Sequence, residues 1–112
     1  MCIFCQIIEK KSPANIVYED ETAIAFHTLN PVAPVHLLIV PKKHIASVND
    51  LLPEDEAVIG HLMRVGRMLA EQNGIATSGY RLVINTGPHG GQSVYHLHVH
   101  LIGGRHLPFR FD

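Results

Sequence analysis

The sequence predicts an α+β domain, in which a mostly antiparallel five-stranded sheet packs against one long helix and a short N-terminal helix. The chain has 112 residues, of which 46% are hydrophobic and 17% are charged, a composition typical of one folded domain. Its predicted strands do not alternate regularly with helices, because three precede the long helix and two follow it. That order favours an α+β topology. Because the sequence contains no internal repeat and no linker, residues 1–112 are expected to form a single domain.

Short apolar segments bounded by turn residues define the predicted strands. Residues 35–40 are apolar except for His36 and lie between two prolines, which is typical of a strand buried on both faces. Residues 4–9 have apolar side chains at helical spacing and stop before Pro13, so they predict the short helix. The predicted strands are residues 16–18, 22–27, 35–40, 80–85 and 94–102.

The longest predicted element is a helix over residues 53–73. A proline and three acidic residues suit its first turn, and Asn73-Gly74 supplies a stop. Two apolar stripes run along this helix, and one of them is expected to cover the sheet. The other includes the small residues Gly66 and Ala70, and it is expected either to be buried too or to meet a partner helix in a dimer. The stripes are Val58, Leu62, Val65 and Leu69, and Ile59, Met63, Gly66 and Ala70.

Charge and hydropathy exclude several classes of function. The formal net charge of −1 provides no broad basic surface, so binding to nucleic-acid backbones is not expected. No apolar run is long enough to span a bilayer, so no membrane partner is expected. The first residues carry neither a basic leader nor a long apolar segment, which makes a cytoplasmic location the expectation.

Three histidines alternate with apolar residues in the segment His96-Leu97-His98-Val99-His100-Leu101. On a strand, successive side chains point to opposite faces, so the three imidazoles would share one face and point toward a cleft. Such a cluster indicates a functional site. Two chemistries remain open: the histidines could hold a catalytic zinc ion, or one neutral imidazole could attack phosphorus.

The loop before this segment favours a phosphate ligand. Gly90-Gly91-Gln92-Ser93 would let main-chain N–H groups approach an anion, and the Ser93 hydroxyl would add a donor. A glycine-rich loop without a ligand is the alternative.

Three segments carry a resemblance to a known family. They are residues 91–104, residues 33–36 together with 40–44, and residues 79–85. The segment Gly91-Gln92-Ser93-Val94-Tyr95-His96-Leu97-His98-Val99-His100-Leu101-Ile102-Gly103-Gly104 resembles the signature of histidine-triad (HIT) proteins, in the Hint or nucleoside phosphoramidase branch. The resemblance covers nearly the whole chain.

The resemblance implies a nucleotide hydrolase that works through a covalent nucleotidyl-histidine intermediate. His98 would be the nucleophile, His100 would contact the phosphate, and His36 would support the triad from a neighbouring strand. The substrate would be a purine nucleoside 5′-phosphoramidate or a related nucleoside monophosphate ester or anhydride, and two copies would join their sheets in a homodimer. The remaining nucleotide-binding positions would be Ser93, Gly91 and Gln92 near the phosphate, Asn85 and Thr28 near the sugar, and Ile3, Phe4, Ile7, Phe26, Leu29 and Leu38 around the base.

A pair of cysteines, Cys2-x-x-Cys5, indicates either half of a metal site or free thiols. Some bacterial histidine-triad proteins, and the related uridylyltransferases, bind structural zinc through such a pair and two histidines. The matching positions here are His44 and His96, so the resemblance implies a tetrahedral zinc site of two sulfur and two nitrogen ligands.

Two positions depart from the pattern of the Hint branch. Thr28 stands where that branch usually has an acidic residue on the ribose hydroxyls, and the tail at residues 106–112 lacks the usual tryptophan, for which Phe109 or Phe111 would have to substitute. Three alternative functions remain: a dinucleoside-polyphosphate hydrolase or nucleotidyl transferase, a nucleotide-binding dimeric adaptor, and a metalloenzyme that holds zinc with all three histidines.

Overall fold

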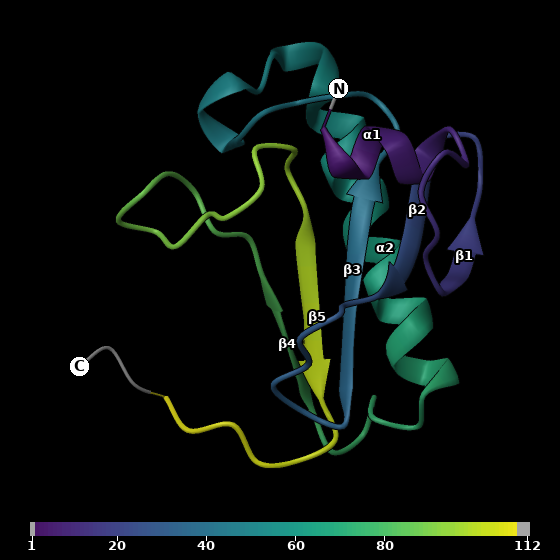
Figure 1. The fold of residues 1–112 in the computed structure, drawn as a ribbon. Helices are drawn as coiled ribbons and strands as arrows, with labels where there is room; N and C mark the ends of the chain where they lie inside the picture. The colour runs from purple at the N-terminus through teal and green to yellow at the C-terminus, as the bar shows by residue number, and fades with distance from the viewer. Residues whose placement is uncertain (1, 110–112) are drawn as a thin grey trace.

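The structure, a computed structural model, describes residues 2–109 (Figure 1). Five strands form one fully antiparallel sheet in the order β1-β2-β3-β5-β4, so the predicted α+β fold is confirmed. The helices are α1 (Ile3–Ile8) and α2 (Glu56–Gln72), and two short 3₁₀ turns, Val48–Asp50 and Pro53–Asp55, precede α2. The strands are β1 (Ile16–Glu19), β2 (Ala23–His27), β3 (Val35–Pro41), β4 (Tyr80–Val83) and β5 (Val99–Gly103).

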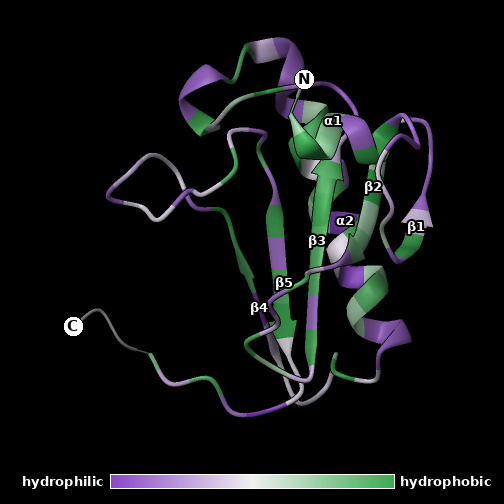
Figure 2. Ribbon diagram, in the orientation of Figure 1, coloured by the Kyte–Doolittle hydropathy of each residue, from purple (hydrophilic) through white to green (hydrophobic). Residues whose placement is uncertain are grey.

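Helices cover both faces of the sheet, and Figure 1 shows α2 behind it and α1 in front of one end. Alternate residues of β3 point into two separate cores: Leu37 and Ile39 pack with α2, whereas Leu38 and Val40 pack with Phe4 of α1. Figure 2 shows the resulting run of hydrophobic residues along β3, which His36 interrupts. The prediction that residues 35–40 form a strand buried on both faces is therefore confirmed.

The small residues of α2 face the chain's own sheet. A Cβ atom on Gly66 would lie only 3.0 Å from Cδ2 of Leu82 and 3.3 Å from Cδ1 of Ile39. Ala70 is completely buried in the same core. The idea that this stripe meets a partner helix is therefore wrong for both residues, because their small size is what lets α2 lie close to its own sheet.

The last strand begins later than predicted, at Val99 rather than at residue 94. The Leu97 main-chain N–H donates to the Ile45 carbonyl at 2.7 Å, a contact outside the sheet ladder, and so keeps the preceding residues out of the ladder. Only His100 of the three histidines therefore lies on β5. Leu97, Val99 and Leu101 nevertheless share one core, so the predicted separation of apolar residues from histidines holds. Strand β4 likewise ends at Val83, before the predicted residue 85.

A carboxylate ties the turn between β1 and β2 to α2. Asp20 accepts hydrogen bonds from the main-chain N–H groups of Thr22 and Ala23, both at 2.7 Å, and from the Tyr18 hydroxyl at 2.6 Å. Its other contact is Nε2 of His61 on α2, also at 2.6 Å. Burial raises the pKa of Asp20, but these hydrogen bonds outweigh burial and hold its pKa well below the usual value. His61 thus has a structural role on the face that α2 covers.

Within residues 2–109, no helix has the length and apolar character that crossing a lipid bilayer requires.

Candidate active site and metal centre

A cavity of about 370 Å³ lies on the face of the sheet that carries α1. Its wall combines apolar side chains from α1, β2 and β3 with the imidazoles of His98 and His100 and the hydroxyl-bearing residues Thr28 and Ser93. Ten of the predicted site residues line it: Ile3, Phe4, Ile7, Phe26, Thr28, Leu29, Leu38, Ser93, His98 and His100. Four others do not: His36, Asn85, Gly91 and Gln92.

Six residues of the cavity wall were not predicted from the sequence. They come from segments that only the fold brings together: the turn after α1, the end of β2 with the connection to β3, and the loop before β5. No motif marks them: His27 is the last residue of β2, and the others lie in irregular segments. These residues are Pro13, Ala14, Asn15, His27, Asn30 and Val94.

His98 is held in one tautomer. Its Nδ1 lies 2.8 Å from the main-chain carbonyl oxygen of His96, which can only accept a hydrogen bond, so Nδ1 carries the proton. In the neutral ring, Nε2 is then left with its lone pair. Because the His98 side chain lines the cavity, this nitrogen is the group that can act as a nucleophile there.

A chain of hydrogen bonds fixes the opposite role for His100. The main-chain N–H of Val32 donates to Nδ1 of His36 at 3.2 Å, so the proton of the neutral His36 ring is on Nε2. That Nε2 lies 2.9 Å from Nδ1 of His100 and donates to it. The proton of a neutral His100 is therefore on Nε2, and His100 offers a donor where His98 offers a lone pair. His36 reaches the cavity only through His100.

Burial keeps the imidazoles of His36, His98 and His100 neutral at physiological pH. It lowers the pKa values of His36 and His98 from the ordinary value of 6.5, although the bond to the His96 carbonyl partly opposes this for His98. Burial, with the neighbouring rings of His98 and His36, lowers the pKa of His100 to about 4. The hydrogen-bond directions deduced above hold as long as these rings stay neutral.

Acid is expected to destabilise the fold through these histidines. In the unfolded chain His100 would take up a proton near pH 6.5, but in the folded chain only near pH 4. Between those values the unfolded state binds more protons, so the free energy of unfolding falls as the pH drops from 6.5 toward 4. Urea unfolding at pH steps across this window should show a smaller loss for His100→Asn than for the wild type. An identical pH dependence of the two proteins would contradict this assignment.

The buried side chain of Gln92 holds the glycine-rich loop through hydrogen bonds to the main chain. Gln92 is 7% exposed; its Nε2 donates to the Ala46 and Val94 carbonyls at 2.7 and 3.1 Å, and its Oε1 accepts from the Gly87 N–H at 3.0 Å. Its side chain therefore holds the loop in place rather than lining the cavity. Gly91 has a φ of +80°, which favours glycine. The Ser93 hydroxyl, at the cavity, has no hydrogen-bond partner among residues 2–109.

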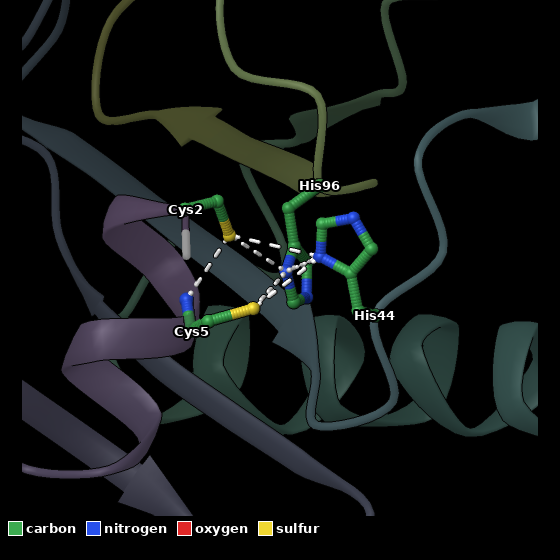
Figure 3. Close-up of side chains that lie close together, drawn as sticks. All are labelled: Cys2, Cys5, His44 and His96. Atoms are coloured by element: carbon green, nitrogen blue, oxygen red, sulfur yellow. Dashed lines mark hydrogen bonds between the residues drawn. The ribbon is translucent and has the colours of Figure 1, made fainter.

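The predicted metal ligands converge on one point. Figure 3 shows Cys2 and Cys5 from the start of α1, His44 from the segment after β3, and His96 from the segment before β5, with their ligand atoms directed toward one another. These atoms all lie within 4.8 Å of one another. The four sulfur–nitrogen distances are 3.3 to 3.7 Å, and the two Nδ1 atoms are 3.1 Å apart.

These distances fit a tetrahedral zinc site. Zn–S bonds near 2.3 Å and Zn–N bonds of 2.0–2.1 Å imply sulfur–nitrogen separations of about 3.6 Å and a nitrogen–nitrogen separation of about 3.3 Å. The His96 ring is also oriented for coordination, because its Nε2 donates to the Pro41 carbonyl at 2.7 Å and leaves Nδ1 free to bind a metal. Two thiols and two imidazoles are the donor set that structural zinc prefers.

The three triad histidines do not form a common metal site. The ring of His96 belongs to the cysteine cluster, His98 bonds to a main-chain carbonyl, and His100 bonds to His36. Among the residues that the structure describes, the cysteine–histidine cluster is the one group of three or more potential ligands. The alternative of a catalytic zinc on all three histidines is therefore wrong.

Thr28 lies on the cavity wall, and its Oγ1 accepts a hydrogen bond from the Asn30 N–H at 3.3 Å. Among residues 2–109, no carboxylate lines this cavity.

A second cavity, of about 200 Å³, lies where β4 begins and the tail follows β5. Its two arginines donate to main-chain carbonyls: Arg81 to Leu107 and Pro108, and Arg105 to Val32. In the tail Phe109 is 81% exposed, and Phe111 lies outside the described residues.

The chain belongs to the histidine-triad (HIT) family. The family described as scavenger mRNA decapping enzyme C-term binding matches residues 1–109. The chain is 50% identical to the purine nucleoside phosphoramidase of Escherichia coli K12 and 52% identical to an uncharacterized HIT-like protein of Synechococcus elongatus. Each match covers 94% of this chain, and 88% and 91% of those relatives respectively.

Solved structures of the family have the same fold. A HIT family hydrolase from Legionella pneumophila superposes with a TM-score of 0.96 at 44% identity, and the match covers 97% of both chains. A histidine triad protein from Clostridium difficile gives a TM-score of 0.95 at 42% identity, covering 98% of this chain and 96% of that one.

Proposed function

We propose that the protein hydrolyses purine nucleoside 5′-phosphoramidates, or related nucleoside monophosphate esters and anhydrides, through a nucleotidyl group carried on His98. The observation that carries this proposal is the fixed tautomer of His98, whose Nδ1–H is bonded to the His96 carbonyl and whose Nε2 is therefore free to attack. The purine nucleoside phosphoramidase of E. coli, at 50% identity, supports the choice of substrate.

The first chemical step would form a bond between Nε2 of His98 and phosphorus. The phosphorus–nitrogen bond breaks, its electron pair goes to the leaving nitrogen, and that nitrogen takes up a proton from solvent and departs as an amine. The His98 ring becomes positively charged, and the His96 carbonyl stabilises that charge through Nδ1–H. Nε2–H of His100 can donate to a phosphoryl oxygen as negative charge builds there, together with the Ser93 hydroxyl.

Water would complete the cycle. It attacks phosphorus and loses a proton to solvent, and the bond from phosphorus to Nε2 of His98 breaks with its electron pair returning to the ring. The nucleoside monophosphate then leaves, and the ring is neutral again. Asn85 and the main chain at Gly91 remain proposed contacts of the sugar and phosphate, although neither lines the cavity in this structure. Phe4, Phe26 and Leu38 supply flat and aliphatic surfaces suited to a purine base.

We further propose that the cysteine–histidine cluster holds structural zinc and that the protein is a homodimer. The ligand distances support the first proposal. When bound, zinc would cross-link the start of α1 to the segments that follow β3 and precede β5. The sheet edges support the second proposal: β4 is one of the two edge strands, with β1 the other, and one side of its main chain is unpaired within residues 2–109.

Intact-mass analysis after rapid quenching tests the proposed chemistry. The protein mixed with adenosine 5′-phosphoramidate should gain the mass of an adenylyl group within one turnover, and His98→Asn should gain none. Cleavage of a dinucleoside polyphosphate at a higher kcat/KM than the phosphoramidate would favour the polyphosphate alternative. Nucleotide binding without an adduct or turnover would favour an adaptor. Native mass spectrometry of the same sample should give twice the chain mass; a monomer would rule out the homodimer.

A further inference from the structure

We propose that metal occupancy of the Cys2–Cys5–His44–His96 centre controls the affinity of the neighbouring cavity for its nucleotide. The proposal deepens the proposed function and rests on it. Two parts of the chain connect the sites: helix α1, which contributes residues to both, and His96, a metal-ligand position whose main-chain carbonyl holds the His98 ring of the cavity.

Helix α1 is one wall of the cavity and also carries half of the metal ligands. The Cys2 thiol caps the helix by accepting from the Cys5 N–H at 3.2 Å, and Cys5 lies within the helix. Ile3, Phe4 and Ile7 of the same helix line the cavity. A helix of only six residues has little stability of its own, so tertiary anchors must hold it. The metal centre is one such anchor, and the packing of Phe4 and Ile7 is the other.

Phe4 links the two sites most directly. It lies between the two cysteines in sequence, and its ring meets the ring of His98 edge-on, with centroids 5.1 Å apart and an interplanar angle of 87°. The same ring lies 6.0 Å from that of His96. A shift of α1 on loss of the metal would therefore move a ring that touches the proposed nucleophile.

His96 provides the second link. Its ring offers Nδ1 to the metal, while its main-chain carbonyl holds Nδ1–H of His98 at 2.8 Å. If His96 has no metal bond, its ring keeps the hydrogen bond to the Pro41 carbonyl. On the other side, among the described residues, its Nδ1 then has only the two cysteine thiols, at 3.4 and 3.6 Å, and the His44 ring, at 3.1 Å, as polar neighbours. The carbonyl that orients His98 is then held less firmly. Both links act in the same direction, since the metal favours the conformation in which the cavity is complete.

Linkage makes this coupling reciprocal. If zinc raises the affinity for a nucleotide by some factor, the nucleotide must raise the affinity for zinc by the same factor. Coupling between neighbouring sites commonly amounts to 5- to 150-fold, and a factor of about ten is the expectation here.

The test compares zinc-loaded protein with protein from which a chelator has removed zinc. Calorimetry should show that adenosine 5′-monophosphate binds about tenfold more weakly to the zinc-free form. Competition with a chromophoric chelator should show that saturating nucleotide raises zinc affinity by the same factor. Hydrogen exchange of the amides of residues 3–8, measured without nucleotide, should be faster when zinc is absent.

Two variants locate the coupling. Phe4→Leu should reduce the zinc-dependent ratio of nucleotide affinities toward one, because leucine keeps apolar volume but loses the edge contacts with both imidazoles. The matched control is His61→Gln, which disturbs the opposite face of the sheet and should leave the ratio unchanged.

The outcomes distinguish a failure of the coupling from a failure of the proposed function. Equal nucleotide affinity with and without zinc overturns the coupling and leaves the function standing. If neither form binds the nucleotide, the proposed function fails and the coupling fails with it, because there is no nucleotide affinity for zinc to change. Unchanged hydrogen exchange in α1 on removal of zinc also overturns the coupling. Purified protein that binds no stoichiometric zinc also overturns it.

Discussion

His98→Asn is expected to lower kcat/KM for adenosine 5′-phosphoramidate by at least about 10⁴-fold, because it removes the atom that would bond to phosphorus. Asparagine can still donate from its amide to the His96 carbonyl, so the local hydrogen bond that replaces the one from Nδ1 can survive. The variant should therefore keep its thermal stability and its affinity for adenosine 5′-monophosphate within a few-fold. Steady-state kinetics with thermal melts and calorimetry on the same preparation check all three.

Ser93→Ala provides the comparison for that result. It removes one donor at the cavity and not the nucleophile, so a loss of about 10- to 1000-fold is expected. An adenylyl adduct on His98→Asn would show that His98 is not the nucleophile. So would a loss of kcat/KM in His98→Asn no larger than the loss in Ser93→Ala.

Cys5→Ser is expected to abolish stoichiometric zinc binding and to lower Tm by roughly 10 °C. A hydroxyl is a much poorer zinc ligand than a thiolate, and the remaining three ligands would hold the ion weakly. At free zinc about 100 times the Kd, a site present only in the folded state contributes about 2.7 kcal/mol, which sets the size of the Tm change. Metal analysis by mass spectrometry and calorimetric melting measure the two effects.

His89→Asn is the control for that variant, because His89 is an exposed histidine outside the cluster. It should keep both the zinc content and the Tm of the wild type. Full zinc retention by Cys5→Ser would show that Cys5 is not a ligand.

The regular parts of the fold were predictable because their signals are local. The apolar run at residues 35–40 and the amphipathic segment at residues 53–73 both formed the expected elements, with the first helical turn taking 3₁₀ form. The start of β5 was not predictable, because it depends on a hydrogen bond from Leu97 to Ile45, a residue far away in sequence. Whether Gly66 meets the sheet or a partner helix stayed open for a similar reason: helical periodicity does not tell which of two stripes the sheet will meet.

The site, like the fold, was predictable where its signals are local in sequence and not where they depend on distant segments. The histidine signature and the cysteine pair identified the chemical groups, and the structure brings the predicted metal ligands together. Tautomers could not be deduced from spacing, since they follow from the Val32 N–H and the His96 carbonyl, both main-chain groups. The cavity wall at residues 13–15 was equally hidden, because it depends on how the chain turns after α1.

The two cores on opposite faces of the sheet have a consequence for how this protein can change. Buried residues of α2, such as Leu62 and Leu69, neither line the cavity nor belong to the cysteine–histidine cluster. Substitutions there should alter stability in steps that add to, and do not modify, the effects of substitutions around Phe4 and Phe26. Substitutions on the α2 side of the sheet can thus raise the free energy of unfolding, while substitutions on the α1 side change ligand preference. The two kinds of change can occur independently and in either order.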